Sequence, residues 1–214
     1  MSLARTERIA MAAQFLHLGP DVPTLCEGWN SADLLHHLLI RERRPDAAVG
    51  ILLKPLSFWT ERVTQGFAAM PWPELVRLLR TGPPLWNPMG WGRLQELTNN
   101  AEMLIHHEDL RRGQPDWSPR TLAPEDRRQV TALLSSPVTR MGLGRSGPGV
   151  IARVTDDPGH PDHTVVLRRG DPGVTVIGGG VEIVLWATGR RAVQVEFDGD
   201  PVAVEQVHGP GRGR

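Results

Sequence analysis

The sequence WGRLQELTNNAEMLIHHEDLRRG, residues 91–113, carries a clear helical pattern. At about 100° per residue, five apolar side chains of this segment fall on one face of a helix. They are Leu94, Leu97, Ala101, Leu104 and Ile105. A helix with one apolar face must bury that face against other elements. The segment therefore predicts a long helix packed inside a helical domain.

Polar residues of the same segment form a second stripe beside the apolar one. Glu102 and His106 are four residues apart, so both side chains point the same way about one turn apart. This spacing suits a helical metal site with two ligands. Asp109 comes one turn later and is a candidate to hold the other ring nitrogen of His106. His107 and Glu108 project elsewhere, and we expect them to be exposed to solvent.

A third ligand must come from another helix, and ADLLHHLLIRERR, residues 32–44, offers two histidines. Ser31 is a good N-cap for this helix and Pro45 closes or kinks it. Periodicity does not choose between His36 and His37. The alternatives also stay open at this point: an exposed Glu/His pair on a helix, or a hydrogen-bonded histidine in a leucine-rich core.

Further helical patterns make the first 140 residues a helical domain, for which a bundle of about four helices is the simplest arrangement. They lie in the N-terminal segment ending at Gly19-Pro20, in residues 73–82, and in residues 123–136, where Pro124 suits the first turn. The Pro/Trp-rich residues 82–92 read as a long connection.

A Gly/Pro/Ser-rich stretch at residues 136–149 predicts a linker, and a second domain, residues 141–214, begins within it. Its segments are predicted from β-branched content, turn residues and bounding glycines. Strands are expected at 149–156, 163–169, 173–179 and 192–201, with a helix at 179–190. The expected fold is a helical bundle followed by a small α+β domain.

The composition argues against several classes of function. Lys+Arg and Asp+Glu both number 24, so no global field attracts nucleic acid or an anionic membrane. Cys26 is the only cysteine, which excludes an internal disulfide and a cysteine-based zinc cluster and fits a reducing compartment. We expect Cys26 to act as a small buried hydrophobe.

The N-terminal residues lack the apolar core of a signal peptide, and no stretch of about twenty residues is apolar enough to span a bilayer. We therefore expect a cytoplasmic protein.

Three motifs resemble the mycothiol-dependent maleylpyruvate isomerase family. PTLCEGWNSADLLHHL, residues 23–38, is similar to the family's T-x-C-x-G-W-x-x-x-D-L-x-x-H-L pattern, and EMLIHHED, residues 102–109, to its E-x-x-x-H-x-x-D. GGGVEIVLWATGR, residues 178–190, with FDGDP, residues 197–201, resembles its C-terminal segment. The doublets His36-His37 and His106-His107 are not general features of the isomerases, and HHEDLRRGQPDW, residues 106–117, resembles more closely an uncharacterised actinobacterial branch of predicted metal-binding proteins.

The resemblance implies a DinB-like four-helix bundle that holds a divalent metal, usually zinc. Carried onto this chain, it implies the ligands His37, Glu102 and His106, which leave a fourth position open as in catalytic zinc sites. Arg190 would hold a carboxylate of the thiol or substrate, or else serve as a cation at a helix end.

The implied activity is a mycothiol-using S-transferase or isomerase. The implied partners are a small-molecule thiol and an electrophilic substrate. From the composition we expect no nucleic-acid or membrane partner, and we expect a monomer or homodimer. The alternative is a non-catalytic protein that binds a metal or a small ligand.

Overall fold

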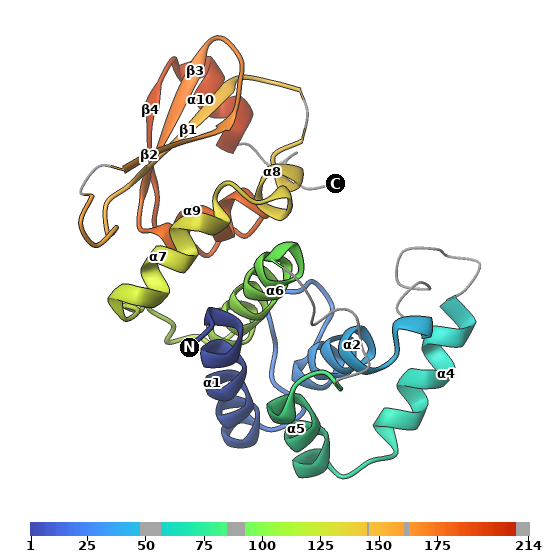
Figure 1. Ribbon diagram of the computed structural model, residues 1–214. Helices are drawn as coiled ribbons and strands as arrows, with labels where there is room; N and C mark the ends of the chain where they lie inside the picture. The colour runs from blue at the N-terminus through green and yellow to red at the C-terminus, as the bar shows by residue number, and fades with distance from the viewer. Residues whose placement is uncertain (48–56, 85–92, 145, 161–162, 209–214) are drawn as a thin grey trace. The chain divides into compact units, whose positions relative to one another are not determined.

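A computed structural model describes residues 1–47, 57–84, 93–144, 146–160 and 163–208 (Figure 1). The chain divides into two compact units, Met1–Trp117 and Ser118–Arg214. The sequence predicts this order, a helical unit followed by a unit that contains a small sheet. Among the described helices, none is both long enough and apolar enough to cross a membrane.

The first unit is helical throughout its named elements. They are α1 (Leu3–Leu18), α2 (Ser31–Arg43), α4 (Ser57–Ala68), α5 (Trp72–Thr81) and α6 (Arg93–Arg112). α1 ends where the sequence predicts, because Gly19 follows it with φ at 82°, a conformation that favours glycine. Most of the predicted Pro/Trp-rich connection lies outside the described residues.

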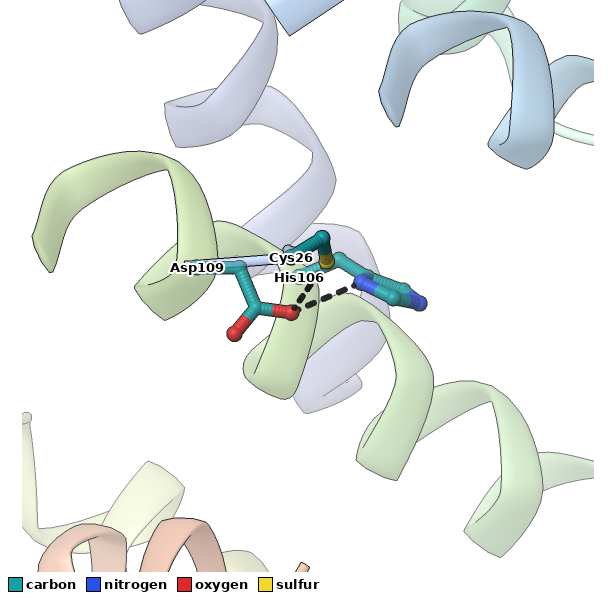
Figure 2. A group of neighbouring side chains, drawn as sticks. All are labelled: Cys26, His106 and Asp109. Carbon is teal, nitrogen blue, oxygen red and sulfur yellow. Dashed lines mark hydrogen bonds and ion pairs between the residues drawn. The ribbon is translucent and has the colours of Figure 1, made fainter. Parts of the chain in front are cut away.

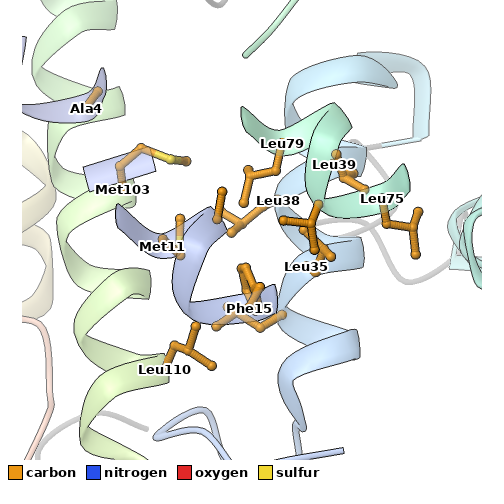
Figure 3. Packing of buried hydrophobic residues seen from close by; sticks show 13 residues of the cluster. Ala4, Met11, Phe15, Leu35, Leu38, Leu39, Leu75, Leu79, Met103 and Leu110 are labelled. Atoms are coloured by element: carbon orange, nitrogen blue, oxygen red, sulfur yellow. The ribbon is translucent and has the colours of Figure 1, made fainter. Parts of the chain in front are cut away.

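Four of these helices, α1, α2, α5 and α6, share one hydrophobic core (Figure 3). Phe15 of α1 and Leu38 of α2 are completely buried in it, and Phe15 meets the ring of Trp72 edge to face at 5.7 Å between centroids. Burying a side chain of this size contributes about 1.5–3 kcal/mol. The core thus fixes α2 against its neighbours. The DinB-like bundle topology stays a prediction.

The start of α2 differs by one residue from the prediction. Asn30, not Ser31, is the N-cap: its side chain accepts a hydrogen bond from the Asp33 amide at 3.0 Å, and the Asp33 carboxylate accepts one from the Asn30 amide at 3.1 Å. This reciprocal pair is a capping box. Ser31 is instead buried, and its hydroxyl donates to the Gly19 carbonyl at 2.6 Å. The cap sets where α2 begins.

The second unit contains helices and one four-stranded mixed sheet with the order β2-β1-β3-β4. β1 (Gly149–Val154) pairs antiparallel with β2 (His163–Arg168) and parallel with β3 (Gly173–Gly178), and β4 (Glu196–Gly199) pairs antiparallel with β3. The predicted strands are present, although the last is shorter than expected. The helices of this unit are α7 (Pro124–Leu133), α8 (Pro137–Gly142), α9 (Gly180–Ala187) and α10 (Pro201–His208).

The predicted helix at 179–190 is α9, and it is buried over its whole length. It contacts α7 and α8 as well as β1 and β3. A helix covered on all sides needs apolar residues all round, which explains why Val and Ile are tolerated here despite their modest helix propensity.

The boundary between the units lies earlier than the predicted boundary at residue 140. α7 packs against α9: a Cβ placed on Gly180 would lie 3.2 Å from Cγ1 of Val130. α7 therefore belongs to the second unit, and the division falls between Trp117 and Ser118. The Gly/Pro/Ser-rich stretch at 136–149 contains α8 and the turn into β1, so its composition reflects turns inside a unit rather than a linker between units.

Candidate metal centre

A tight loop after α1 forms one wall of the candidate site. The Leu25 amide donates to the Asp109 carbonyl at 3.0 Å, and Nε2 of Gln114 donates to the Pro23 carbonyl at 2.9 Å. Gly113 makes this approach possible, since a Cβ there would lie only 2.4 Å from the Pro23 oxygen. The loop is thereby held against the last turns of α6.

His37, Glu102 and His106 converge from two helices. Their potential ligand atoms all lie within 4.8 Å of one another. The imidazole rings of His37 and His106 are 5.2 Å apart, and Nε2 of His106 is 3.3 Å from Oε2 of Glu102. His36 is buried and is not a member of this group. The structure thus brings His37, and not His36, together with Glu102 and His106.

The other nitrogen of His106 faces a buried carboxylate (Figure 2). Nδ1 lies 3.0 Å from Oδ2 of Asp109, whose side chain is 0% exposed. The arrangement leaves Nε2 directed away from Asp109 and toward Glu102. Asp109 therefore has the position that the sequence predicts, one turn after His106 and in contact with its ring.

Cys26 is a site residue that sequence reasoning missed. Its sulfur lies 3.3 Å from Oδ2 of Asp109, the same oxygen that faces His106 (Figure 2). Cys26, His106 and Asp109 form a second group whose potential ligand atoms lie within 4.8 Å of one another. The only sequence signal for this contact is the position of Cys26 within the motif that precedes α2.

Arg41 was also missed. It follows His37 by one turn of α2, so the two side chains share a face. Its Nε lies 3.6 Å from Oε2 of Glu102, and its Nη1 donates to Oδ1 of Asn99 at 3.2 Å. The side chain of Arg41 is only 10% exposed, so this guanidinium sits among the candidate ligands.

Burial and neighbouring charges shift the pKa values of the three candidate ligands in different directions. Burial and the nearby His106 lower the pKa of His37 to about 4, which leaves this imidazole neutral and able to donate a lone pair at neutral pH. Burial raises the pKa of Glu102, but the hydrogen bond from His106 and the charge of Arg41 outweigh it and bring that pKa down to about 2.

His106 shows the opposite shift. Burial lowers the pKa of this imidazole, but hydrogen bonds to Asp109, Cys26 and Glu102 outweigh burial and hold the pKa well above its ordinary value. Without a metal, His106 is therefore the group of the cluster that carries an exchangeable proton at neutral pH.

The predicted exposure of His107 and Glu108 is wrong. His107 is 4% exposed and its Nδ1 lies 2.5 Å from Oε2 of Glu7 on α1. Glu108 is completely buried and pairs with Arg111 and Arg112 at 3.0 and 2.6 Å. α6 is covered on more faces than its apolar stripe suggests, and paired ionic groups fill the remainder. Both residues nevertheless stay outside the candidate metal group.

Arg190 follows α9 in the second unit, where it donates hydrogen bonds to backbone carbonyls. Its Nη1 donates to the Thr188 carbonyl at 2.9 Å, and its amide donates to the Leu185 carbonyl at 2.9 Å. These contacts place its backbone at the carbonyl end of a helix, which is where a cation is favourable. A role for Arg190 toward substrate stays a prediction.

The donor set fits a divalent transition metal. Two imidazole nitrogens and one carboxylate are the ligands that zinc takes in catalytic sites, and they leave a position for water or substrate. Asp109 behind His106 supplies the carboxylate that commonly orients a metal-binding imidazole. Trp29, 37% exposed, lies beside His37 with 5.2 Å between ring centroids and forms an aromatic edge of the cluster.

These features define a class: a helical unit with a His/Glu/His cluster, followed by a small α+β unit. Two solved structures share the fold. The mycothiol-dependent maleylpyruvate isomerase has 18% sequence identity and a TM-score of 0.57, with 92% of this chain and 90% of that chain covered. A histidine-to-alanine mutant of a mycothiol-dependent maleylpyruvate isomerase aligns at 16% identity with the same TM-score and coverage. No family model and no curated protein matches this chain.

Proposed function

We propose that this protein is a metal-dependent enzyme that uses a low-molecular-weight thiol, mycothiol being the leading candidate. The convergence of His37, Glu102 and His106 from α2 and α6 carries this proposal. The shared fold supports it, since the solved neighbours are mycothiol-dependent isomerases. The metal is a divalent cation, with zinc favoured by the two imidazoles and one carboxylate.

His37, Glu102 and His106 would hold the metal. A divalent cation there lowers the pKa of a coordinated thiol and so favours the reactive thiolate. Asp109 would keep the Nδ1 proton on His106, which leaves Nε2 free to act as a ligand. Trp29 would cover one side of the thiol or substrate with an apolar ring.

The reaction would join the thiol to an electrophilic carbon, such as an alkene carbon conjugated to a carbonyl. The thiolate electron pair forms the carbon–sulfur bond while the π electrons move to the carbonyl oxygen. Rotation about the new single bond, followed by return of the electron pair and loss of the thiolate, gives isomerisation. Uptake of a proton at the adjacent carbon instead gives a thioether, which is S-transfer.

We propose Arg190 as a residue that binds a carboxylate of the thiol or substrate.

A non-catalytic metal- or ligand-binding protein is the second candidate. One observation favours it: the candidate ligands already satisfy one another, with Glu102 paired to both Arg41 and His106. Such a cluster can hold α2 and α6 together without any chemistry.

The test combines metal analysis with turnover. Purified protein should bind about one zinc ion per chain, and the zinc-loaded protein should isomerise an electrophile such as maleylpyruvate only when mycothiol is present, or consume mycothiol to form a thioether. Zinc binding with no mycothiol-dependent conversion of any of a panel of electrophiles, by isomerisation or by thioether formation, would favour the binding protein. Absence of any stoichiometric metal, with unchanged thermal stability on zinc addition, would remove both the metal-dependent enzyme and the metal-binding protein.

A further inference from the structure

Arg41 is a positively charged group at the proposed metal centre, in addition to the metal itself. Its guanidinium and the His106 ring approach the same Glu102 oxygen, at 3.6 Å from Nε of Arg41 and 3.3 Å from Nε2 of His106. Oδ1 of Asn99 accepts a hydrogen bond, at 3.2 Å, from one of the five N–H groups of the guanidinium. Arg41 is therefore held in place beside the ligand atoms by two groups from α6.

The charges at this place do not balance once a metal is bound. The divalent cation and Arg41 together bring three positive charges. With both histidines neutral, Glu102 is the one acidic residue among the described residues that pairs with Arg41 and also belongs to the proposed ligand group, and it offsets one of these charges. Asp109, behind His106, offsets one more. One positive charge remains at a place where the side chains of Arg41 and Glu102 are 10% and 26% exposed, and an uncompensated charge with so little access to water is costly. A single negative charge on the bound ligand would balance it.

We propose that Arg41 makes this centre selective for a monoanionic ligand at the open metal position. This inference rests on the proposed metal site. The shared chemistry is one negative charge on a small donor, which a thiolate or a carboxylate provides. Arg41 would accept this anion through the guanidinium donors that Asn99 does not use, while the metal takes over Glu102.

A purely structural role for Arg41 predicts something else. If Arg41 only neutralises Glu102 in the metal-free chain, its removal changes metal affinity and leaves the preference among external ligands unchanged. Selection of an anion predicts opposite effects on two quantities. Loss of Arg41 removes a cation that competes with the metal for Glu102, so zinc affinity stays equal or rises, while anion affinity falls.

The experiment uses full-length protein loaded with cobalt(II), whose visible absorption reports its ligands. Thiocyanate is the monoanionic probe and imidazole is the neutral probe of the same open position. The variants are Arg41→Gln, which keeps a donor for Asn99, Arg41→Met, which does not, and Arg41→Lys, which keeps the charge. Arg44→Met is the matched control, because Arg44 is a more exposed arginine just past the end of α2 that pairs with Asp46.

Arg41→Gln and Arg41→Met should bind thiocyanate about tenfold or more weakly than the wild type, with imidazole affinity changed by about twofold or less. Arg41→Lys should recover most of the thiocyanate affinity, and Arg44→Met should match the wild type. Titrations with 2-mercaptoethanol and acetate then distinguish a thiolate from a carboxylate. The kind of anion that the centre binds physiologically should lose more affinity when Arg41 is replaced.

Equal loss of thiocyanate and imidazole affinity, or loss of neither, would overturn the role of Arg41 while leaving the metal centre standing. Failure of the wild type to bind cobalt or zinc would overturn the metal centre itself, and this inference with it. Zinc affinity measured in parallel shows that each variant still forms the site.

Discussion

His106 and Asp109 lie one turn apart on α6, with Nδ1 of the imidazole 3.0 Å from Oδ2 of a fully buried carboxylate. A buried carboxylate in this position fixes the ring orientation and keeps the proton on Nδ1. It follows that Nε2, which faces Glu102 and His37, is the nitrogen prepared for a metal.

Asp109→Asn should weaken zinc binding about 10- to 100-fold, because the amide orients the ring less firmly and lowers its basicity. Isothermal titration with zinc measures the change. Cys26→Ser is the matched comparison: it keeps a donor next to Asp109 and should have a much smaller effect. Zinc affinity unchanged in Asp109→Asn would show that His106 needs no such support.

His37→Ala and Glu102→Gln should each reduce bound zinc to well below one ion per chain, since each removes one of three proposed ligands. His36→Ala, at the neighbouring position on α2, should retain zinc. Metal content after dialysis decides the matter. Loss of zinc from the His36 variant and retention by the His37 variant would reverse the assignment.

Zinc binding should release about one proton per ion near neutral pH. His37, with a pKa of about 4, and Glu102, with a pKa of about 2, are already deprotonated, whereas the raised pKa of His106 keeps that ring protonated until the metal replaces the proton. Zinc affinity should therefore fall as the pH is lowered, by about tenfold per unit below the pKa of His106.

Calorimetry in buffers of different ionisation enthalpy counts the protons released. Release of none, or of two, would mean that a different set of groups titrates when the metal binds.

Gly113→Ala should destabilise the first unit by about 1–3 kcal/mol, because its Cβ would collide with the backbone of Pro23 and Thr24. Urea unfolding measures the loss, and zinc affinity should fall with it as the loop shifts. Gly66→Ala is the control, since no atom lies within 4 Å of its added Cβ and the site is an exposed helix position. That control should be neutral or stabilising by up to about 1 kcal/mol. Equal stability of both variants would show that the loop does not depend on Gly113.

The parts of the site that lie within one helix were predictable from the sequence. Glu102, His106 and Asp109 are related only by the helical repeat, so their shared stripe follows from their spacing. The choice of His37 over His36 came from the family resemblance and not from the helical repeat, because it depends on how α2 is rotated against the core. That rotation is a property of packing between distant segments, and the sequence pattern alone left both histidines open.

The residues that were missed or misplaced share a physical cause. His107 and Glu108 are charged or polar and yet buried, since partners from α1 and from the next turn of α6 satisfy them. Cys26 and Arg41 reach the cluster through tertiary contacts. Similarly, α7 looked like a continuation of the helical domain, although it packs on α9 of the second unit.

X-ray absorption at the zinc edge, recorded with and without mycothiol, tests the central claim most directly. The prediction is a site with nitrogen and oxygen ligands, including two imidazoles, that gains one sulfur at about 2.3 Å when mycothiol is added. A protein that retains zinc but shows no sulfur ligand with saturating mycothiol, or that retains no zinc at all, would contradict it.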